Sequence, residues 1–365
     1  MSNTTTLNNV GLSLSGGGVR ALAFHAGLLK FLAENNLMEK VTNVSSVSGG
    51  SLFTGLVFHY AKNKWAGDTE YLNSVLPQIR KLITTTSLQK SSMAALIKPS
   101  NWKNILNRGA VIAQTIESLW GIKSRLSDLP QAPVWTINGT NGENGRRFRF
   151  KNGTMGDYKT GYAAAGSFKT ATAMAVSAAF PIGIGPVEIE TEKYIWERET
   201  GWETGKTERV YPPYTKMHIY DGGLYDNLGT EAFFDIGRQC IKSSAKNLDF
   251  MIVSDAGTPF DDKPVPNPLS FGRASNLVNI LMDQDRSLRV RSFQNFFINN
   301  RGSGMYISMG DDLLSNVELH EAGLSTDEIN TARNYPTTLE IMKEKDFDAL
   351  VKYGCAAAGL SLKNN

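Results

Sequence analysis

The first 62 residues alternate between strand-like and helix-like patterns, and this alternation constrains the fold more than any other feature. Residues 10–15 predict a strand that ends in residues 16–18, three glycines, after which residues 19–34 carry apolar side chains at helical spacing. Residues 41–47 predict a second strand and residues 51–62 a second helix. Strands and helices that alternate in this way indicate an α/β fold: a mostly parallel central sheet flanked by helices, with functional loops at the carboxyl ends of its strands.

Further strand-like segments extend this pattern as far as residue 260, and they are expected at residues 134–138, 147–151 and 250–253. The charged and aromatic stretch at residues 188–216 predicts a protruding hairpin within this domain. Residues 281–297 and 338–358 have helical periodicity, so the sheet is expected to lie in the first two thirds of the chain. We therefore expect one α/β domain over residues 9–260 and a mostly helical extension over residues 261–365 that packs on the same unit.

Composition argues against several classes of protein. A net charge of +3 on 365 residues, with no window dominated by lysine or arginine, disfavours a nucleic-acid-binding protein. The two cysteines, Cys240 and Cys355, form neither a disulfide framework nor a paired metal motif, and they fit a reducing compartment. The N-terminus lacks the basic and apolar regions of a signal peptide, and no apolar run reaches the ~18 residues of a membrane span. We therefore expect a cytoplasmic protein.

The first glycine-rich junction, Gly16-Gly17-Gly18, permits two kinds of binding site. With Ala21 it fits the dinucleotide fingerprint G-x-G-x-x-G/A, but the second predicted strand ends at Ser48 without the acidic residue that binds a ribose. The lysine of a phosphate-binding P-loop is also missing. What the glycines do provide is backbone N–H groups at the start of a helix, where they can donate to an oxyanion.

Ser48 lies at the second junction, between a predicted strand and Gly49-Gly50. This arrangement matches the strained turn of G-x-S-x-G enzymes, in which small neighbours let the helix pack back on the strand while the serine hydroxyl stays accessible. Ser46 replaces the first glycine of that pattern. A helix N-cap is the alternative role for Ser48, and the presence of a partner base decides between the two.

The candidate bases are His218 and Asp221. Side chains alternate along a strand, so these two residues, three positions apart, are expected on opposite faces, and no Asp–His relay is predicted. Asp221 precedes Gly222-Gly223 and can present its carboxylate at the same sheet edge as Ser48. An aspartate in an ordinary turn is the alternative interpretation.

Taken in order, these segments resemble the G-G-G-x-R, G-x-S-x-G and D-G-G/A motifs of the patatin-like phospholipases. The matching segments are residues 16–20, 46–50 and 221–223, and residues 173–186 resemble that family's small-residue segment before a proline. The resemblance covers residues 9–229 and departs from the family pattern at position 46. It implies a three-layer α/β sandwich of the patatin type.

The resemblance also implies a serine lipid acyl hydrolase of the phospholipase A or lysophospholipase type. Ser48 would attack an ester carbonyl, Asp221 would accept its proton, and water would hydrolyse the resulting acyl-enzyme. The N–H groups of Gly16, Gly17 and Gly18 would form the oxyanion hole. The implied chemistry needs no metal and no cofactor, and its substrate is a phospholipid or another lipid ester. A noncatalytic module of the same fold that binds an anionic ligand or a partner is the alternative.

Two further expectations concern lipid. Arg20, which follows the glycines, would support their loop or contact a lipid phosphate. Residues 76–120 carry apolar side chains and tryptophans between basic residues. Such basic amphipathic helices suit peripheral contact with an anionic membrane surface, and they equally suit packing against the sheet.

Overall fold

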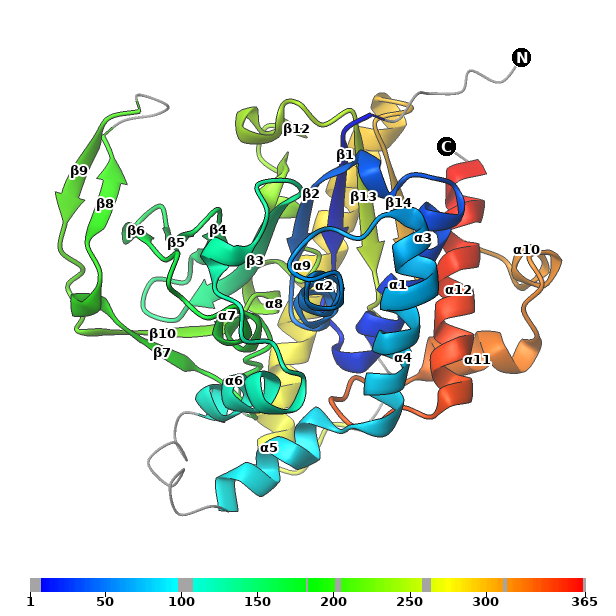
Figure 1. The fold of residues 1–365 in the computed structure, drawn as a ribbon, viewed down its shortest axis with the longest axis horizontal. Helices are drawn as coiled ribbons and strands as arrows, with labels where there is room; N and C mark the ends of the chain where they lie inside the picture. Colours follow the sequence, from blue (N-terminus) through cyan, green and yellow to red (C-terminus); the bar gives the residue numbers. More distant parts are fainter. Residues whose placement is uncertain are drawn as a thin grey trace.

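The computed structural model describes residues 8–97, 108–181, 183–200, 205–257, 264–310 and 314–363. Its centre is a 12-stranded mixed sheet (Figure 1). The strands at one end of this sheet pair in parallel, and in spatial order they are β14 (Gly304–Ser308), β13 (Phe250–Asp255), β1 (Val10–Leu14), β2 (Val41–Ser46) and β3 (Val134–Asn141). The expectation of a mostly parallel central sheet is confirmed.

Antiparallel strands extend the sheet beyond β3. β10 (Lys216–Asp221) pairs with β3 and with β7 (Val187–Glu190), and this register places Asp221 opposite Gly139. Ile137, on the same strand, pairs with Ser46 at the end of β2. Asp221 therefore lies beside the point where the chain leaves β2 toward Ser48. The other antiparallel strands are β4 (Arg147–Lys151), β5 (Thr154–Asp157), β6 (Gly161–Ala164), β8 (Trp196–Glu199) and β9 (Thr207–Val210).

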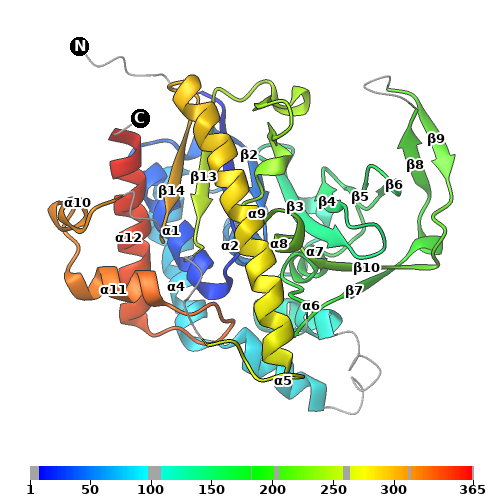
Figure 2. The same cartoon turned by 180° about the vertical axis from the view of Figure 1, so that it is seen from behind.

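Helices cover both faces of the sheet and complete three layers. α9 (Phe271–Asn299) crosses one face, while α1 (Gly18–Glu34), α2 (Gly49–Tyr60) and α12 (Glu344–Lys363) cover the other (Figure 1, Figure 2). Phe293 of α9 packs with Val253 of β13 in one hydrophobic cluster, and Leu22 of α1 packs with Ile252 in the other. The α/β sandwich expected from the sequence is confirmed.

The remaining helices surround these layers. They are α3 (Asp68–Glu70), α4 (Leu76–Thr85), α5 (Leu88–Ile97), α6 (Arg108–Leu119), α7 (Thr170–Ser177), α8 (Gly223–Asp226), α10 (Asn316–Glu321) and α11 (Thr326–Asn334); the short strands β11 (Phe234–Asp235) and β12 (Cys240–Ile241) form a separate pair. None of the helices in the described ranges is both long and apolar enough to cross a bilayer. The cytoplasmic location stays a prediction.

The C-terminal third contributes a strand to the sheet. β14 is buried along its length and pairs with β13, so the expectation of a sheet confined to the first two thirds is wrong. A short apolar run of this kind cannot be separated from a buried helix segment by periodicity. α12 begins at Glu344, later than expected, and the carbonyl of Thr338 instead accepts the N–H of Val19. These contacts favour the proposal that residues 261–365 pack on residues 9–260 as one unit. The boundary near residue 260 stays a proposal.

The predicted hairpin at residues 188–216 is shorter in the structure. Its first residues belong to β7, which pairs with β10 in the central sheet. β8 and β9 pair with each other and protrude at the far edge of the molecule, and β8 also pairs with β6 (Figure 1). Alternating charges mark an exposed strand, but they do not show where the chain leaves the sheet.

The amphipathic pattern of residues 76–120 corresponds to α4, α5 and α6. Ile79, Ile83 and Trp120 are buried, so packing accounts for part of the pattern. Residues 98–107, which include Trp102 and two of the basic positions, lie outside the described residues. A membrane role for this segment therefore depends on the side chains that α5 exposes.

Candidate active site

Ser48 occupies a strained turn between β2 and α2. Its backbone angles are φ 49° and ψ −118°, an uncommon conformation for a residue other than glycine. The Ser48 N–H donates to the carbonyl oxygen of Ser177 at 3.1 Å and to its Oγ at 3.0 Å. The Ser48 side chain makes no capping hydrogen bond to α2, whose residues are all described. Its hydroxyl is therefore available for another partner.

The neighbours of Ser48 must be small because the two glycine-rich junctions pack on each other. A Cβ at Gly49 would lie 2.2 Å from the carbonyl oxygen of Gly18, and a Cβ at Gly50 would lie 2.6 Å from that of Leu14. Ser46, the departure from the family pattern, is fully buried, and its hydroxyl bonds Ser51 Oγ and Trp135 Nε1, each at 2.8 Å. The turn accommodates a serine there because its polar atom is satisfied in the core.

Asp221 lies at the end of β10 and is 2% exposed. Its carboxyl group accepts the Gly223 N–H at 2.7 Å and lies close enough to the Ser48 side chain for Ser48 to favour its ionised form. Burial raises the pKa of this carboxyl to about 7, although the Gly223 N–H and the Ser48 side chain both act in the opposite direction. The structure thus brings together the two residues that the sequence marked as nucleophile and base.

The end of α7 holds both residues in place. The Ser177 carbonyl accepts the N–H groups of Ser48 and Gly222, and the Ala179 carbonyl accepts the Asp221 N–H at 3.0 Å. Ser177 Oγ also donates to the Asn138 carbonyl at 2.6 Å. Sequence reasoning assigned no role to Ser177. The small-residue match at residues 173–186 was the only signal that pointed to this segment.

The histidines do not contact this pair. The imidazole Nδ1 of His218 lies 2.6 Å from Glu143 Oε1, and alternation along β10 separates it from the buried Asp221. His25 is buried against Ser254 and the Ser15 carbonyl, and burial lowers its pKa to about 4. The expectation that no Asp–His relay forms agrees with this geometry.

The first glycine loop provides backbone donors beside Ser48. Gly17 and Gly18 have φ 138° and φ 61°, values that favour glycine, and α1 begins at Gly18. Within the described residues, the N–H groups of Gly17, Gly18 and Gly49 have no hydrogen-bond acceptor. The Gly16 N–H instead donates to the Asn227 carbonyl at 3.1 Å, so Gly16 is a poorer candidate donor than sequence reasoning assumed.

Arg20 is 6% exposed and connects the glycine loop to the C-terminal part of the chain. Its Nη1 donates to the Tyr335 carbonyl at 3.0 Å, and the Val19 N–H donates to the Thr338 carbonyl at 2.8 Å. These bonds favour the loop-supporting role over phosphate contact.

A cavity of about 1360 Å³ joins these groups. Ser48, Asp221, Arg20 and the glycines at 16–18 all lie in its wall. Many apolar side chains in the wall come from α5, α6 and the segment after α7: Met93, Leu96, Ile97, Val111, Ile112, Phe180 and Ile184. The part formed by α9 is mainly polar, with Ser275, Asn276, Asn279, Asp283 and Arg286 beside Met282. The cavity is large enough for an amphiphile.

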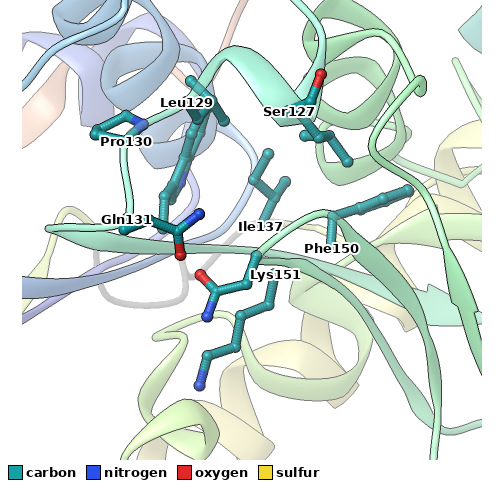
Figure 3. Close-up of a pocket in the computed structure, with 10 residues that line it drawn as sticks. Ser127, Leu129, Pro130, Gln131, Ile137, Phe150 and Lys151 are labelled. Carbon is teal, nitrogen blue, oxygen red and sulfur yellow. The ribbon is translucent and has the colours of Figure 1, made fainter.

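A second pocket, beside β3 and β4, has a volume of only about 40 Å³. Leu129 and Pro130 lie on one side of it, and Ile137, Phe150 and Lys151 from the sheet lie on the other (Figure 3). It contains neither Ser48 nor Asp221 and is too small for a lipid. The large cavity is therefore the candidate active site.

Comparison with known proteins gives the family. The family model described as Patatin-like phospholipase matches residues 12–234. This chain belongs to the patatin-like phospholipase family. No curated protein matches the sequence.

Solved structures of human GIVD cytosolic phospholipase A2 share the fold of this patatin-like chain. One has a TM-score of 0.54 at 13% identity and covers 98% of this chain. Another, in complex with methyl γ-linolenyl fluorophosphonate, has a TM-score of 0.55 at 16% identity, also over 98% of this chain. This chain spans 60% and 58% of the length of those two chains.

Proposed function

We propose that the protein hydrolyses carboxylic esters of lipids, with Ser48 as nucleophile and Asp221 as its base. The observation that carries this proposal is the placement of the Ser48 side chain beside the buried Asp221 carboxyl in the wall of a large cavity. Membership of the patatin-like phospholipase family supports it.

The reaction would proceed through an acyl-enzyme. Ser48 Oγ attacks the ester carbonyl while its proton passes to Asp221, and the N–H groups of Gly17, Gly18 and Gly49 donate to the oxyanion. The tetrahedral intermediate collapses, and Asp221 returns the proton to the leaving alkoxide. Asp221 then takes a proton from water, which attacks the acyl-serine and releases a fatty acid, and the proton restores Ser48.

The electrostatics of Asp221 fit this role. A carboxylate with an ordinary pKa is a weak base for a serine hydroxyl, whereas a pKa of about 7 makes it stronger while leaving it half ionised at neutral pH. Burial therefore supplies basicity that a histidine supplies in other serine hydrolases.

The wall of the cavity indicates an amphiphilic substrate. The acyl chain would lie against α5, α6 and Phe180, and the polar part of the leaving group would lie against Asn279 and its neighbours on α9. A phospholipid or lysophospholipid has this division. Human GIVD cytosolic phospholipase A2, which shares the fold, is solved with a lipid fluorophosphonate bound.

Turnover of the Ser48→Ala variant tests the proposal. We expect hydrolysis of lysophosphatidylcholine and of a short-chain chromogenic ester to fall by about 10⁴-fold or more, with the circular dichroism spectrum unchanged. Ser167→Ala, which changes an exposed serine, is the matched control and should keep wild-type turnover. A Ser48→Ala variant with near wild-type turnover would refute the assignment, and a wild-type protein that is folded but shows no burst of released alcohol would favour a noncatalytic module.

A further inference from the structure

Four large apolar side chains are exposed at one end of the molecule. Leu269 is fully exposed, Phe271 is 83% exposed at the start of α9, and on α5 Ile97 and Met93 are 77% and 60% exposed. The start of α9 and the end of α5 both lie at the lower edge of the molecule (Figure 2). Single exposed apolar residues are ordinary on a protein surface, but a group of them at one place indicates a contact surface.

Two of these side chains line the cavity that contains Ser48. Met93 and Ile97 belong to its wall and are exposed at the same time, so they mark where it opens. Phe271 lies one helical turn before Ser275 and two turns before Asn279, both of which line the cavity. Phe271 therefore continues the cavity-lining face of α9 outward. We call Met93, Ile97, Leu269 and Phe271 the apolar rim.

Leu269 adds an independent observation. Its φ is 65°, in the left-handed region that branched side chains rarely occupy, and its side chain is fully exposed. Packing within the fold does not account for a leucine at this position, because the side chain is not buried against anything in the described chain. Such an outlier, just before the helix that lines the cavity, points to a role outside the folded chain.

We propose that the apolar rim inserts into a lipid surface, so that the cavity opens toward that surface. This inference rests on the proposed function, because the lipid substrate supplies the reason for the contact. Met93 and Ile97 connect the rim to the apolar wall, so an acyl chain that leaves a bilayer can reach Ser48 without crossing water. A protein partner on the same rim would instead close the route to Ser48. Arg273, which is exposed two residues after Phe271, is available to phosphate groups.

The test compares wild-type protein with a double variant, Leu269→Asn with Phe271→Gln. Asparagine tolerates the left-handed conformation of position 269, and position 271 is exposed in the first turn of α9, so the variant is expected to fold. Val317→Gln is the matched control, since Val317 is 65% exposed on α10, away from the cavity. The measurements are co-flotation with phosphatidylcholine vesicles, the rate at which a soluble fluorophosphonate labels the protein, and molecular mass in solution.

We expect vesicle binding to fall by about tenfold or more in the double variant and to be unchanged in Val317→Gln. The labelling rate in solution should not change, because neither position lines the cavity. Equal vesicle binding by all three proteins, or no binding by the wild type, would overturn the proposal. A wild-type dimer that becomes a monomer in the double variant would overturn it in favour of self-association.

Failure of the docking proposal can be separated from failure of the proposed function. Vesicle binding that depends on Leu269 and Phe271 in a protein that fluorophosphonate does not label would leave the docking surface standing and refute the hydrolase. Labelling of Ser48 without any vesicle binding would support the hydrolase and refute the docking surface.

Discussion

At the scale of single residues, Asp221 decides between two mechanisms. If Asp221 is the base, Asp221→Asn should lower kcat by about 10⁴-fold, and His218→Ala should leave it nearly unchanged because His218 contacts Glu143 instead. Because the pKa of Asp221 is raised to about 7, kcat/KM of the wild type should fall about tenfold per pH unit below that value. Steady-state kinetics from pH 5 to pH 9 measure both; an active Asp221→Asn protein beside an inactive His218→Ala protein would contradict the dyad.

The same carboxyl group should make the fold less stable at high pH. Its pKa is 3.8 in an ordinary aspartate and about 7 in the fold, so between these values the unfolded chain loses a proton that the folded chain keeps. Stability therefore falls as pH rises through this window, and the cost is fully present above it. Asp221→Asn removes the cost while keeping an acceptor for the Gly223 N–H. In thermal unfolding, the Tm of Asp221→Asn should exceed that of the wild type at pH 8 and not at pH 4. An equal difference in Tm at both pH values would argue against a raised pKa.

Sequence motifs identified the residues at which only one side chain, or only glycine, is compatible with the local backbone. Gly49 and Gly18 were predictable because a Cβ at either position would collide with the other junction or with Thr338. Ser177 and Asn227 were not, since their contacts join segments that are far apart in the sequence. The engaged N–H of Gly16 likewise depends on Asn227, and a local pattern cannot show it.

At the scale of elements, the end of α7 is the support for the site. Ser177→Ala removes the hydroxyl that bonds the Ser48 N–H, Ser51 Oγ and the Asn138 carbonyl. We expect kcat to fall by about 10- to 100-fold with little change in KM, because the substrate wall is intact while Ser48 is misplaced. The free energy of unfolding should fall by about 1–3 kcal/mol. Ser118→Ala, which removes an exposed side-chain hydrogen bond within α6, is the control. A change in KM as large as the fall in kcat in Ser177→Ala would count against a positioning role.

Elements with a long periodic pattern were predicted well, and short or irregular ones were not. β1, α1, β2 and α2 lie close to their predicted positions because each has a full apolar face and a glycine-marked boundary. β14 was missed because five buried residues carry no period that separates strand from helix. The start of α12 was predicted too early because the carbonyl of Thr338 is used by the glycine loop, a contact that helix propensity does not contain.

At the scale of the whole molecule, the C-terminal helix packs on the helix that carries the glycine loop. A Cβ at Gly354 of α12 would lie 2.2 Å from the carbonyl oxygen of Phe24 in α1, and a Cβ at Gly27 would lie equally close to that of Val351. Gly354→Ala should therefore lower the free energy of unfolding by about 1–3 kcal/mol. Gly67→Ala, where no atom lies within 4 Å of the new Cβ, should be nearly neutral. Chemical denaturation measures both, and equal midpoints would contradict this close packing.

The central claim, that Ser48 is a nucleophile activated by Asp221, is tested most directly by mass spectrometry after incubation with a fluorophosphonate. We predict one adduct per chain, mapped to Ser48, that is absent from Ser48→Ala and forms much more slowly in Asp221→Asn. An adduct on Ser45, Ser46 or Ser51, or a folded wild-type protein that forms no adduct at all, would contradict the account.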